Sequence, residues 1–217
     1  TRNAIEFLRS LRDMFAHDGT TLLESRGGLI LRTKFDGAPA IYAGINPENG
    51  KFFVGSKSIF AKNAKLNYTE ADVRANHQGG LADKLSQALK YLPALGIKGI
   101  IHGDFMFSQS DLKSETIDGK KYIVFRPNTI AYAVPEGTPL ANQIRAAQIG
   151  IVFHTSYTGK TMQTLQTHFD VNIGNLNKSK NVWFRTNRLL DVTAAARLSD
   201  ADRKSTRLNS SHTDISR

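Results

Sequence analysis

GLILRTKFDGAPAIYAG, residues 28–44, holds two short β-rich runs on either side of an Asp-Gly pair. The first run covers residues 28–34, the second covers residues 39–44, and Asp36-Gly37 between them is a typical turn signal. A third run at residues 51–54 follows the turn-forming sequence NPENG at residues 46–50. Three runs joined by two such turns predict a β-meander in this part of the chain.

Outside this meander, helical and strand patterns are mixed without a regular β-α-β order. Apolar side chains recur at three- and four-residue steps in residues 4–17 and 81–92, so we expect an amphipathic helix in each stretch. The remaining patterns predict strands at residues 99–107, 122–125, 129–134 and 149–154, and a short helix at residues 140–147. Such a mixture predicts an α+β fold, with antiparallel sheets flanked by helices.

The composition narrows the classes of function. The 217 residues include 29 Lys and Arg against 19 Asp and Glu, so the formal net charge is +10 and we expect a polyanionic partner such as nucleic acid or a nucleotide. The sequence has no cysteine, which excludes disulfide scaffolds, thiolate zinc sites and cysteine nucleophiles. No apolar run approaches the roughly 18 to 20 residues of a membrane span, so we expect a cytoplasmic protein without a membrane partner. We also expect it to be a monomer.

The C-terminal segment differs in kind from the rest. Residues 202–212 read DRKSTRLNSSH, a polar string without a helical or alternating apolar period, which predicts disorder. The string also matches the in-frame translation of a common sequencing-library adapter, so we interpret residues 202–217 as a non-native tail on a metagenomic or shotgun-assembled gene that lacks its natural C-terminus. A natural Ser/Arg-rich tail is the alternative. The tail has four basic and two acidic residues, so the net charge of residues 1–201 is +8.

Lys34-Phe35-Asp36-Gly37 is the most informative string for function. On a strand, residues two apart face the same side, so Lys34 and Asp36 are predicted to present an amine and a carboxylate to one cleft. A surface ion pair at a hairpin end is the alternative. The first interpretation is favoured by the order of later motifs, which are GSKS at residues 55–58, Gly-Asp at 103–104, NTIAYAV at 128–134 and IGIV at 149–152.

With these motifs in this order, the chain resembles the covalent nucleotidyltransferase superfamily of ATP-dependent DNA ligases, RNA ligases and mRNA-capping enzymes. It looks closest to uncharacterised bacteriophage proteins of ligase-like type. The resemblance implies a nucleotidyltransferase (adenylation) domain over residues 1–200. It also implies that Lys34 is the nucleophile that becomes adenylated, and that Arg32, Thr33, Asp36 and Gly37 lie around it at the nucleotide.

The next motifs imply further contacts. Ser56-Lys57 stands where the family has Ser-Arg, a pair that contacts the nucleotide and the nucleic-acid phosphate. Gly103-Asp104 looks similar to the third motif, with aspartate in place of glutamate, which implies that Asp104 holds the ribose or the metal ion. Tyr132 is the implied aromatic residue that stacks on the purine, with Phe125 as the second choice.

The last two motifs depart from the family pattern. The fourth motif normally carries a glutamate before glycine and a lysine further on, and Ile149 and His154 occupy these positions here. The resemblance still places His154 at the nucleotide. Lys178 and Lys180 are the candidates for the pair of lysines in the fifth motif, and a solvated basic loop is the alternative.

The resemblance implies an ATP-dependent polynucleotide ligase that seals nicks or breaks in DNA or RNA through lysyl-AMP, with ATP and Mg²⁺, in the cytoplasm of the host cell if the gene belongs to a phage. A lysine is a poor nucleophile at its reference pKa of about 10.4, so we expect Arg32, Lys57 and the metal ion to favour its neutral form. Two alternatives stay open. One is a catalytically weak phage protein that keeps the fold and binds nucleotide or nucleic acid, and the other is a structural domain with a coincidental KxDG.

Overall fold

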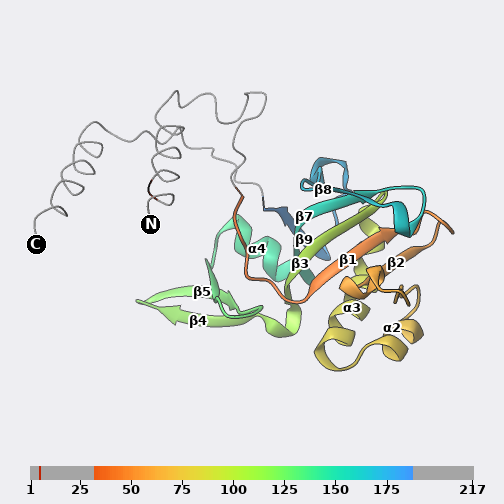
Figure 1. The fold of residues 1–217 in the computed structure, drawn as a ribbon. Coiled ribbons are helices and arrows are strands. Elements are labelled where there is room, and N and C mark those ends of the chain that lie inside the picture. Colours follow the sequence, from red (N-terminus) through yellow and green to blue (C-terminus); the bar gives the residue numbers. More distant parts are fainter. Residues whose placement is uncertain (1–4, 6–31, 188–217) are drawn as a thin grey trace, which may run out of the picture. The chain divides into compact units, whose positions relative to one another are not determined.

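The computed structural model describes Ile5 and residues 32–187, and the statements below concern this part of the chain (Figure 1). The helix expected at residues 4–17, apart from Ile5, lies outside the described residues, as do the first β-rich run up to residue 31 and the tail at residues 202–217. None of the described helices is long and apolar enough to cross a membrane.

Six strands form the main sheet. β1 (Ala40–Ile45) and β2 (Phe52–Gly55) make the expected hairpin, in which Asn46 Oδ1 accepts the Glu48 N–H and Gly50 takes a left-handed φ of 70°. The strand order is β2-β1-β3-β7-β8, all antiparallel, with β3 at Ile100–Ser108, β7 at Ile149–Thr158 and β8 at Gln166–His168. A sixth strand, β9 (Val182–Thr186), pairs with β7 in parallel. The strands expected at residues 99–107 and 149–154 are therefore confirmed as neighbours at the centre of the sheet.

A smaller antiparallel sheet contains β4 (Lys113–Ile117), β5 (Lys120–Phe125) and β6 (Tyr132–Pro135) in that order. Asp118 and Gly119 join β4 to β5 with positive φ angles of 49° and 75°, as a two-residue hairpin turn requires. The strand expected at residues 129–134 begins only at Tyr132, because the backbone N–H groups of residues 129 and 130 bond to a side chain described below.

Within residues 32–187, three α-helices and five short 3₁₀ turns connect the strands. α3 (Gly79–Tyr91) and α4 (Pro139–Ala146) confirm the two helices expected near these positions, whereas α2 (Glu70–Asn76) is not predicted by the apolar pattern. α2 begins at a capping box in which Thr69 and Asp72 each accept the other's backbone N–H. The 3₁₀ turns are η1 (Lys57–Phe60), η2 (Leu92–Leu95), η3 (Gln109–Asp111), η4 (Met162–Thr164) and η5 (Ile173–Asn175).

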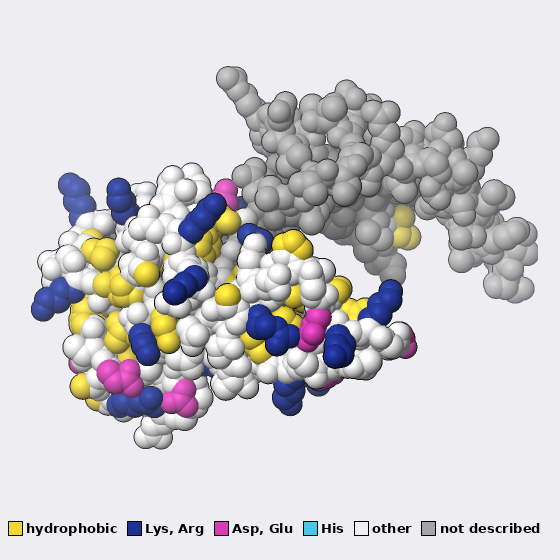
Figure 2. Space-filling model, turned by 180° about the vertical axis from the view of Figure 1, so that it is seen from behind, with side chains coloured by type: hydrophobic (Ala, Val, Ile, Leu, Met, Phe, Trp, Pro, Cys, Tyr) yellow, Lys and Arg dark blue, Asp and Glu magenta, His cyan; other side chains and the backbone are white. Residues whose placement is uncertain are grey.

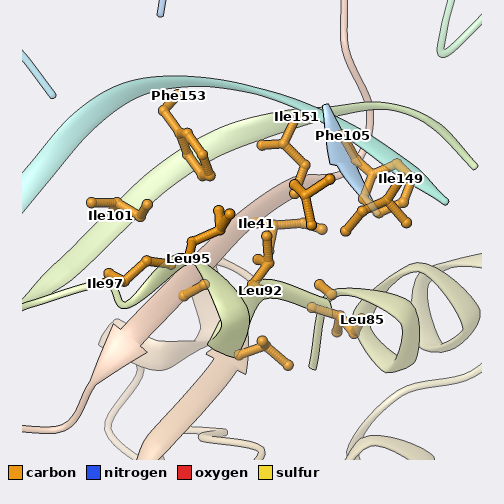
Figure 3. Close-up of a cluster of buried hydrophobic side chains, with 14 of the residues drawn as sticks. Ile41, Leu85, Leu92, Leu95, Ile97, Ile101, Phe105, Ile149, Ile151 and Phe153 are labelled. Carbon is orange, nitrogen blue, oxygen red and sulfur yellow. The ribbon is translucent and has the colours of Figure 1, made fainter. Parts of the chain in front are cut away.

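One face of the main sheet, called the first face here, is closed by α3 and η2. Figure 3 shows Leu85 and Leu92 facing the strand residues Ile41, Ile101 and Phe105, and all five are buried. Every fully buried leucine of this kind contributes about 1.5 to 3 kcal/mol relative to an exposed one. The first face is thus an ordinary aliphatic core.

The opposite, second face carries two separate apolar clusters. One cluster joins the main sheet to the smaller sheet and α4, and its buried members are Met106, Phe107, Ile123, Phe125, Ala141, Ile144, Ala147 and Val152. The other lies toward β2 and η1, and its buried members are Tyr42, Phe53, Ile59, Ile100 and Met162. Polar side chains of β3 and β7 occupy the strip between the two clusters. The described residues therefore form an α+β fold with mainly antiparallel sheets, as expected.

Candidate functional site

The KFDG motif does not lie on a strand, contrary to the sequence prediction. Residues 33–38 run outside any regular strand. At one end the Thr33 N–H donates to Asn187 O just beyond β9, and at the other end the Ala38 N–H donates to Phe105 O on β3. The segment therefore crosses the sheet from the side of β9 toward β1, and the period-two argument for its side chains does not apply.

Asp36 fixes this crossing segment to the smaller sheet. Its carboxylate accepts hydrogen bonds from Asn128 Nδ2 at 2.8 Å and from the backbone N–H groups of Thr129 and Ile130 at 2.7 and 2.8 Å. The backbone N–H of Asp36 donates to Tyr132 Oη at 2.8 Å. The Ile130 N–H, the Asn128 amide and the Thr129 N–H lower the pKa of this carboxyl, with a smaller contribution from the nearby charge of Lys34. Asp36 thus fixes the KFDG motif to the loop at residues 128–130 that precedes β6.

Gly37 makes the closest approach of the motif to the sheet. A Cβ at this position would lie 2.4 Å from Asp104 Cβ and 2.9 Å from Met106 Sδ, so only glycine fits here. Lys34, three residues earlier, is exposed, and Arg32 and Thr33 precede it at the edge of the described residues. The motif therefore presents its lysine to solvent while its glycine contacts the second face.

Asp104 is the carboxylate of the second face. Cross-strand pairing aligns Ala40 on β1, Asp104 on β3, Val152 on β7 and Arg185 on β9 in one row. Phe184 packs into the core of the first face, so its neighbour Arg185 lies on the second face with Asp104. Sequence analysis misses Arg185, because only the pairing of β9 with β7 brings it into this row.

A series of rings leads away from Asp104. His154 Nε2 lies 3.8 Å from Asp104 Oδ1, the His154 ring meets the His102 ring edge-on at 4.3 Å, and His102 stacks on Tyr42 at 4.0 Å with 8° between planes. Burial lowers the pKa of His102 to about 4, assisted by His154, so His102 is neutral at pH 7. Burial also raises the pKa of Tyr42, with a contribution from the neighbouring Tyr157.

His102 leaves one polar atom without a partner. Its Nε2 is buried, and among the described residues it has no hydrogen-bond partner. His154 Nδ1, in contrast, lies 2.8 Å from Thr155 Oγ1. An unsatisfied buried nitrogen costs free energy, so this position in the series of rings is a cost to the stability of the fold.

Ser56 and Lys57 lie at the other end of this series. Ser56 caps η1, where its Oγ accepts the Ser58 N–H at 3.4 Å, and the Lys57 side chain is exposed. Ile59 of η1 is buried in the same cluster as Tyr42. The Ser-Lys motif therefore borders the second face, as does the KFDG motif.

The predicted purine-stacking residue is engaged within the protein. The Tyr132 ring stacks near Phe125 at 5.5 Å and near Phe35 at 6.2 Å, and its hydroxyl bonds to Asp36. Phe125, the second choice, is itself buried in the cluster between the two sheets. In this arrangement Tyr132 serves to hold the KFDG segment, and its stacking on a purine remains a prediction.

The remaining candidates lie away from Asp104. Ile149, in the position of the family's glutamate, is fully buried in the core of the first face. Lys178 and Lys180 are exposed in the loop before β9, whose first residue Val182 pairs with Ile149 at the start of β7. The two lysines therefore lie outside the cross-strand row of Asp104.

The residues present give only a partial metal site. In the range 32–187, no group of three or more His, Cys, Asp or Glu side chains is placed to hold a metal ion. Asp104, with a side chain 23% exposed, is a single hard oxygen donor beside His154. Mg²⁺ is commonly held by one or two carboxylates together with substrate phosphates, so the donor set fits Mg²⁺ only with a phosphorylated ligand.

The chain was compared with known protein families, curated proteins and solved structures. The model of a family of unknown function (DUF6267) matches residues 1–216. No curated protein and no solved structure matches the chain.

Proposed function

We propose that this chain, which belongs to the family of unknown function DUF6267, is an ATP-dependent nucleotidyltransferase of the ligase type with the fold of an adenylation domain. The observation that supports the proposal is the crossing segment, in which Gly37 packs on Asp104 while Lys34 remains exposed. Lys34 thus stands three residues before the glycine that contacts Asp104, on a backbone that Asp36 fixes at its centre.

Lys34 is the nucleophile in this proposal. Its neutral amine attacks the α-phosphorus of ATP, a phosphorus–nitrogen bond forms, the bond to the α–β bridging oxygen breaks, and pyrophosphate leaves. The amine gives up its proton, so the product is a lysyl adenylate. The adenylyl group then passes to a 5′-phosphate on a broken polynucleotide, and the adjacent 3′-hydroxyl displaces AMP to seal the strand.

The negative charge on the phosphates requires cations near Lys34. Arg185 shares the cross-strand row of Asp104 and offers a guanidinium, which binds phosphate oxygens in bidentate fashion. Asp104 and the nucleotide phosphates would hold Mg²⁺, which neutralises phosphate charge when it is bound. His154 beside Asp104 takes the place of the family's lysine.

The polynucleotide is attracted by the charge of the whole molecule. Lys and Arg side chains are spread over the surface seen in Figure 2 and outnumber Asp and Glu there. The net charge of +8 on residues 1–201 favours binding to phosphate backbones, which depends on salt and carries little sequence information. This charge supports a polynucleotide as the second substrate, with DNA and RNA equally compatible.

The test is intact-protein mass spectrometry after incubation with ATP, Mg²⁺ and pyrophosphatase. The wild type should gain the mass of one AMP, and Lys34→Ala should gain none. Lys121→Ala, which removes another exposed lysine, on β5, is the matched control and should label as the wild type does. GTP in place of ATP tests the nucleotide. An adduct that persists in Lys34→Ala, or a wild type that never labels, would reject the proposal.

A second candidate is a nucleotide- or nucleic-acid-binding protein without turnover. The observation that favours it is Ile149, which occupies the position of the family's glutamate and is buried in the core of the first face. Asp104 is therefore left without the second carboxylate that the family pattern supplies. Calorimetric titration with ATP separates the two candidates. Binding without an adduct supports the second, and the absence of both supports a structural domain.

A further inference from the structure

η1 presents an aromatic ring and a lysine on one side. In a 3₁₀ helix, side chains three residues apart eclipse each other, so Lys57 and Phe60 share one side of this single turn. Ile59 between them is 2% exposed and anchors the turn in the core. Phe60 is 48% exposed, and its ring rests on Tyr42 at 5.3 Å and on Tyr157 at 5.6 Å. The Phe60 ring is therefore held by Tyr42 and Tyr157 on one side and is exposed to solvent on the other.

The surroundings of Phe60 are strongly basic. Between Glu48 and Glu70 the chain has four lysines and no acidic residue. Lys57 and Lys62 flank Phe60, are exposed, and form no ion pair with the rest of the described chain. An exposed ring between two lysines that lack an internal counter-charge matches the chemistry of a nucleic-acid strand, whose bases stack and whose phosphates are negative.

Phe169 shows that exposure alone does not make such a site. Its side chain is 73% exposed, more than that of Phe60, but the chain has no Lys or Arg between Lys160 and Lys178, and Asp170 follows it directly. The combination of a supported ring with two lysines distinguishes Phe60 from this other exposed phenylalanine.

The ring of Phe60 is also connected to the proposed reaction centre. Phe60 contacts Tyr42, Tyr42 stacks on His102, His102 meets His154, and His154 approaches Asp104, so an unbroken series of rings crosses the second face. A strand bound at Phe60 would thus lie on the same face as Asp104 and the crossing KFDG segment.

We propose that Phe60, Lys57 and Lys62 form a docking platform for a single-stranded end of a polynucleotide. One unpaired base stacks on the exposed Phe60 ring, and the phosphates on its two sides contact the lysines. The reason for a strand to dock there rests on the proposed ligase function, but binding itself does not depend on adenylation. The contact is sequence-tolerant, because every base has a face that stacks.

The test measures the affinity of a fluorescein-labelled 12-nucleotide single strand, as DNA and as RNA, by fluorescence anisotropy. Phe60→Leu keeps an apolar side chain but loses the ring, and it should weaken binding roughly tenfold. Phe60→Trp keeps a stacking ring and should bind at least as tightly as the wild type. Lys57→Gln combined with Lys62→Gln should lower the slope of log affinity against log salt by about 1.4, the loss of two phosphate contacts on a single strand.

Matched controls exclude general effects. Phe169→Leu removes an exposed ring without flanking lysines, and the pair Lys90→Gln and Lys98→Gln removes two exposed lysines of α3 and of the turn before β3. Phe169→Leu should leave affinity unchanged, and the lysine pair should change it less than the platform pair does. Circular dichroism and thermal melting check that each variant is folded.

The outcomes separate this inference from the proposed function. Wild-type affinity in Phe60→Leu, or equal loss in Phe60→Leu and Phe60→Trp, overturns the platform. Loss of AMP labelling in Phe60→Leu with ATP alone also overturns it, because the ring would then serve the nucleotide. A wild type that binds the strand through Phe60 but never gains AMP supports the platform and rejects the ligase.

Discussion

The two faces of the main sheet are built from the same strands but differ in chemistry. On the first face, α3 and η2 cover an aliphatic surface in which Leu85 and Phe105 are completely buried. On the second face, the apolar residues separate into two clusters, and Asp104, His102 and His154 lie between them. The first face is a hydrophobic core that stabilises the fold. The second face retains titratable groups, and the buried His102 Nε2 there has no hydrogen-bond partner among the described residues.

The difference shows where function is to be sought in this fold. A core gains nothing from ionisable groups, because burying them costs free energy unless each is paired. The strip on the second face keeps such groups half-buried and is crossed by a segment whose course is dictated by Asp36 and Gly37. Substitutions on the two faces therefore test this difference: those on the first face should lower stability, and those on the second face should lower binding or reactivity.

The largest effect on stability is expected on the first face. Leu85→Ala should lower the free energy of unfolding by about 2 to 5 kcal/mol, because it removes a fully buried side chain and leaves a cavity. The fraction of folded protein that gains AMP should not change. Denaturant unfolding measures the first quantity and mass spectrometry the second. A selective loss of labelling in folded Leu85→Ala would mean that the faces are not independent.

On the second face, Gly37→Ala should affect AMP incorporation more than it affects the free energy of unfolding, the reverse of Leu85→Ala. Its Cβ has no room beside Asp104, so the crossing segment must shift, and a displacement of about 1 Å near reacting groups can cost about 100-fold in rate. Gly80→Ala in α3 meets nothing within 4 Å and is the matched control, neutral or slightly stabilising. The rate of AMP incorporation measures the effect, and equal rates in both variants would contradict the assigned course of the segment.

Arg185 tests which cation serves the phosphates. Arg185→Ala should weaken ATP binding by about 10- to 100-fold, since a charge-assisted hydrogen bond contributes about 1.5 to 3 kcal/mol. Lys180→Ala, in the loop before β9, should change the affinity for ATP less than twofold. Calorimetric titration with ATP provides the affinities. The reverse ranking would show that the lysines before β9 reach the nucleotide and that the row through Asp104 does not.

The smallest effect concerns Asp36 and depends on pH. Its carboxyl pKa is lowered by folding, so its charged form stabilises the protein above the ordinary value of 3.8, and this contribution is lost as the pH falls through the lowered value. The wild type should therefore be more stable than Asp36→Asn at pH 7, and the difference should shrink as the pH falls below 3.8 and vanish only below the lowered pKa of the folded state. Unfolding curves at several pH values measure it, with Glu48→Gln, an exposed carboxylate elsewhere, as control. A stability difference between the wild type and Asp36→Asn that stays constant with pH would contradict a stabilising role for the charged Asp36 carboxylate.

Local patterns predict most of the regular elements. The β1–β2 hairpin, β3, α3 and α4 follow from alternation, helical periodicity and turn residues, which act over a few neighbouring positions. The patterns miss α2, whose start depends on a capping box, and β9, which gains its pairing from β7 far away in the chain. They also place Lys34 on a strand, because nothing local reveals that Asp36 bonds to residues more than ninety positions later.

The candidate site is predicted in parts. Asp104 and Ser56-Lys57 are reached from motif order, and the structure places both on or beside the second face. Arg185 and Phe60 escape the motifs. Whether a phenylalanine is buried or exposed is decided by packing, as the contrast between the buried Phe53 and the exposed Phe60 shows.

By itself the sequence determined the α+β class, the hairpin, two helices, the basic charge and the KFDG motif, because these depend on composition and near neighbours. Only the tertiary structure decided that the motif crosses the sheet, that Asp36 serves as an anchor, that Arg185 shares a row with Asp104, and that Phe60 stays open above Tyr42. Each of these contacts joins residues distant in the chain, and their geometry depends on strand order and register, which no local pattern specifies.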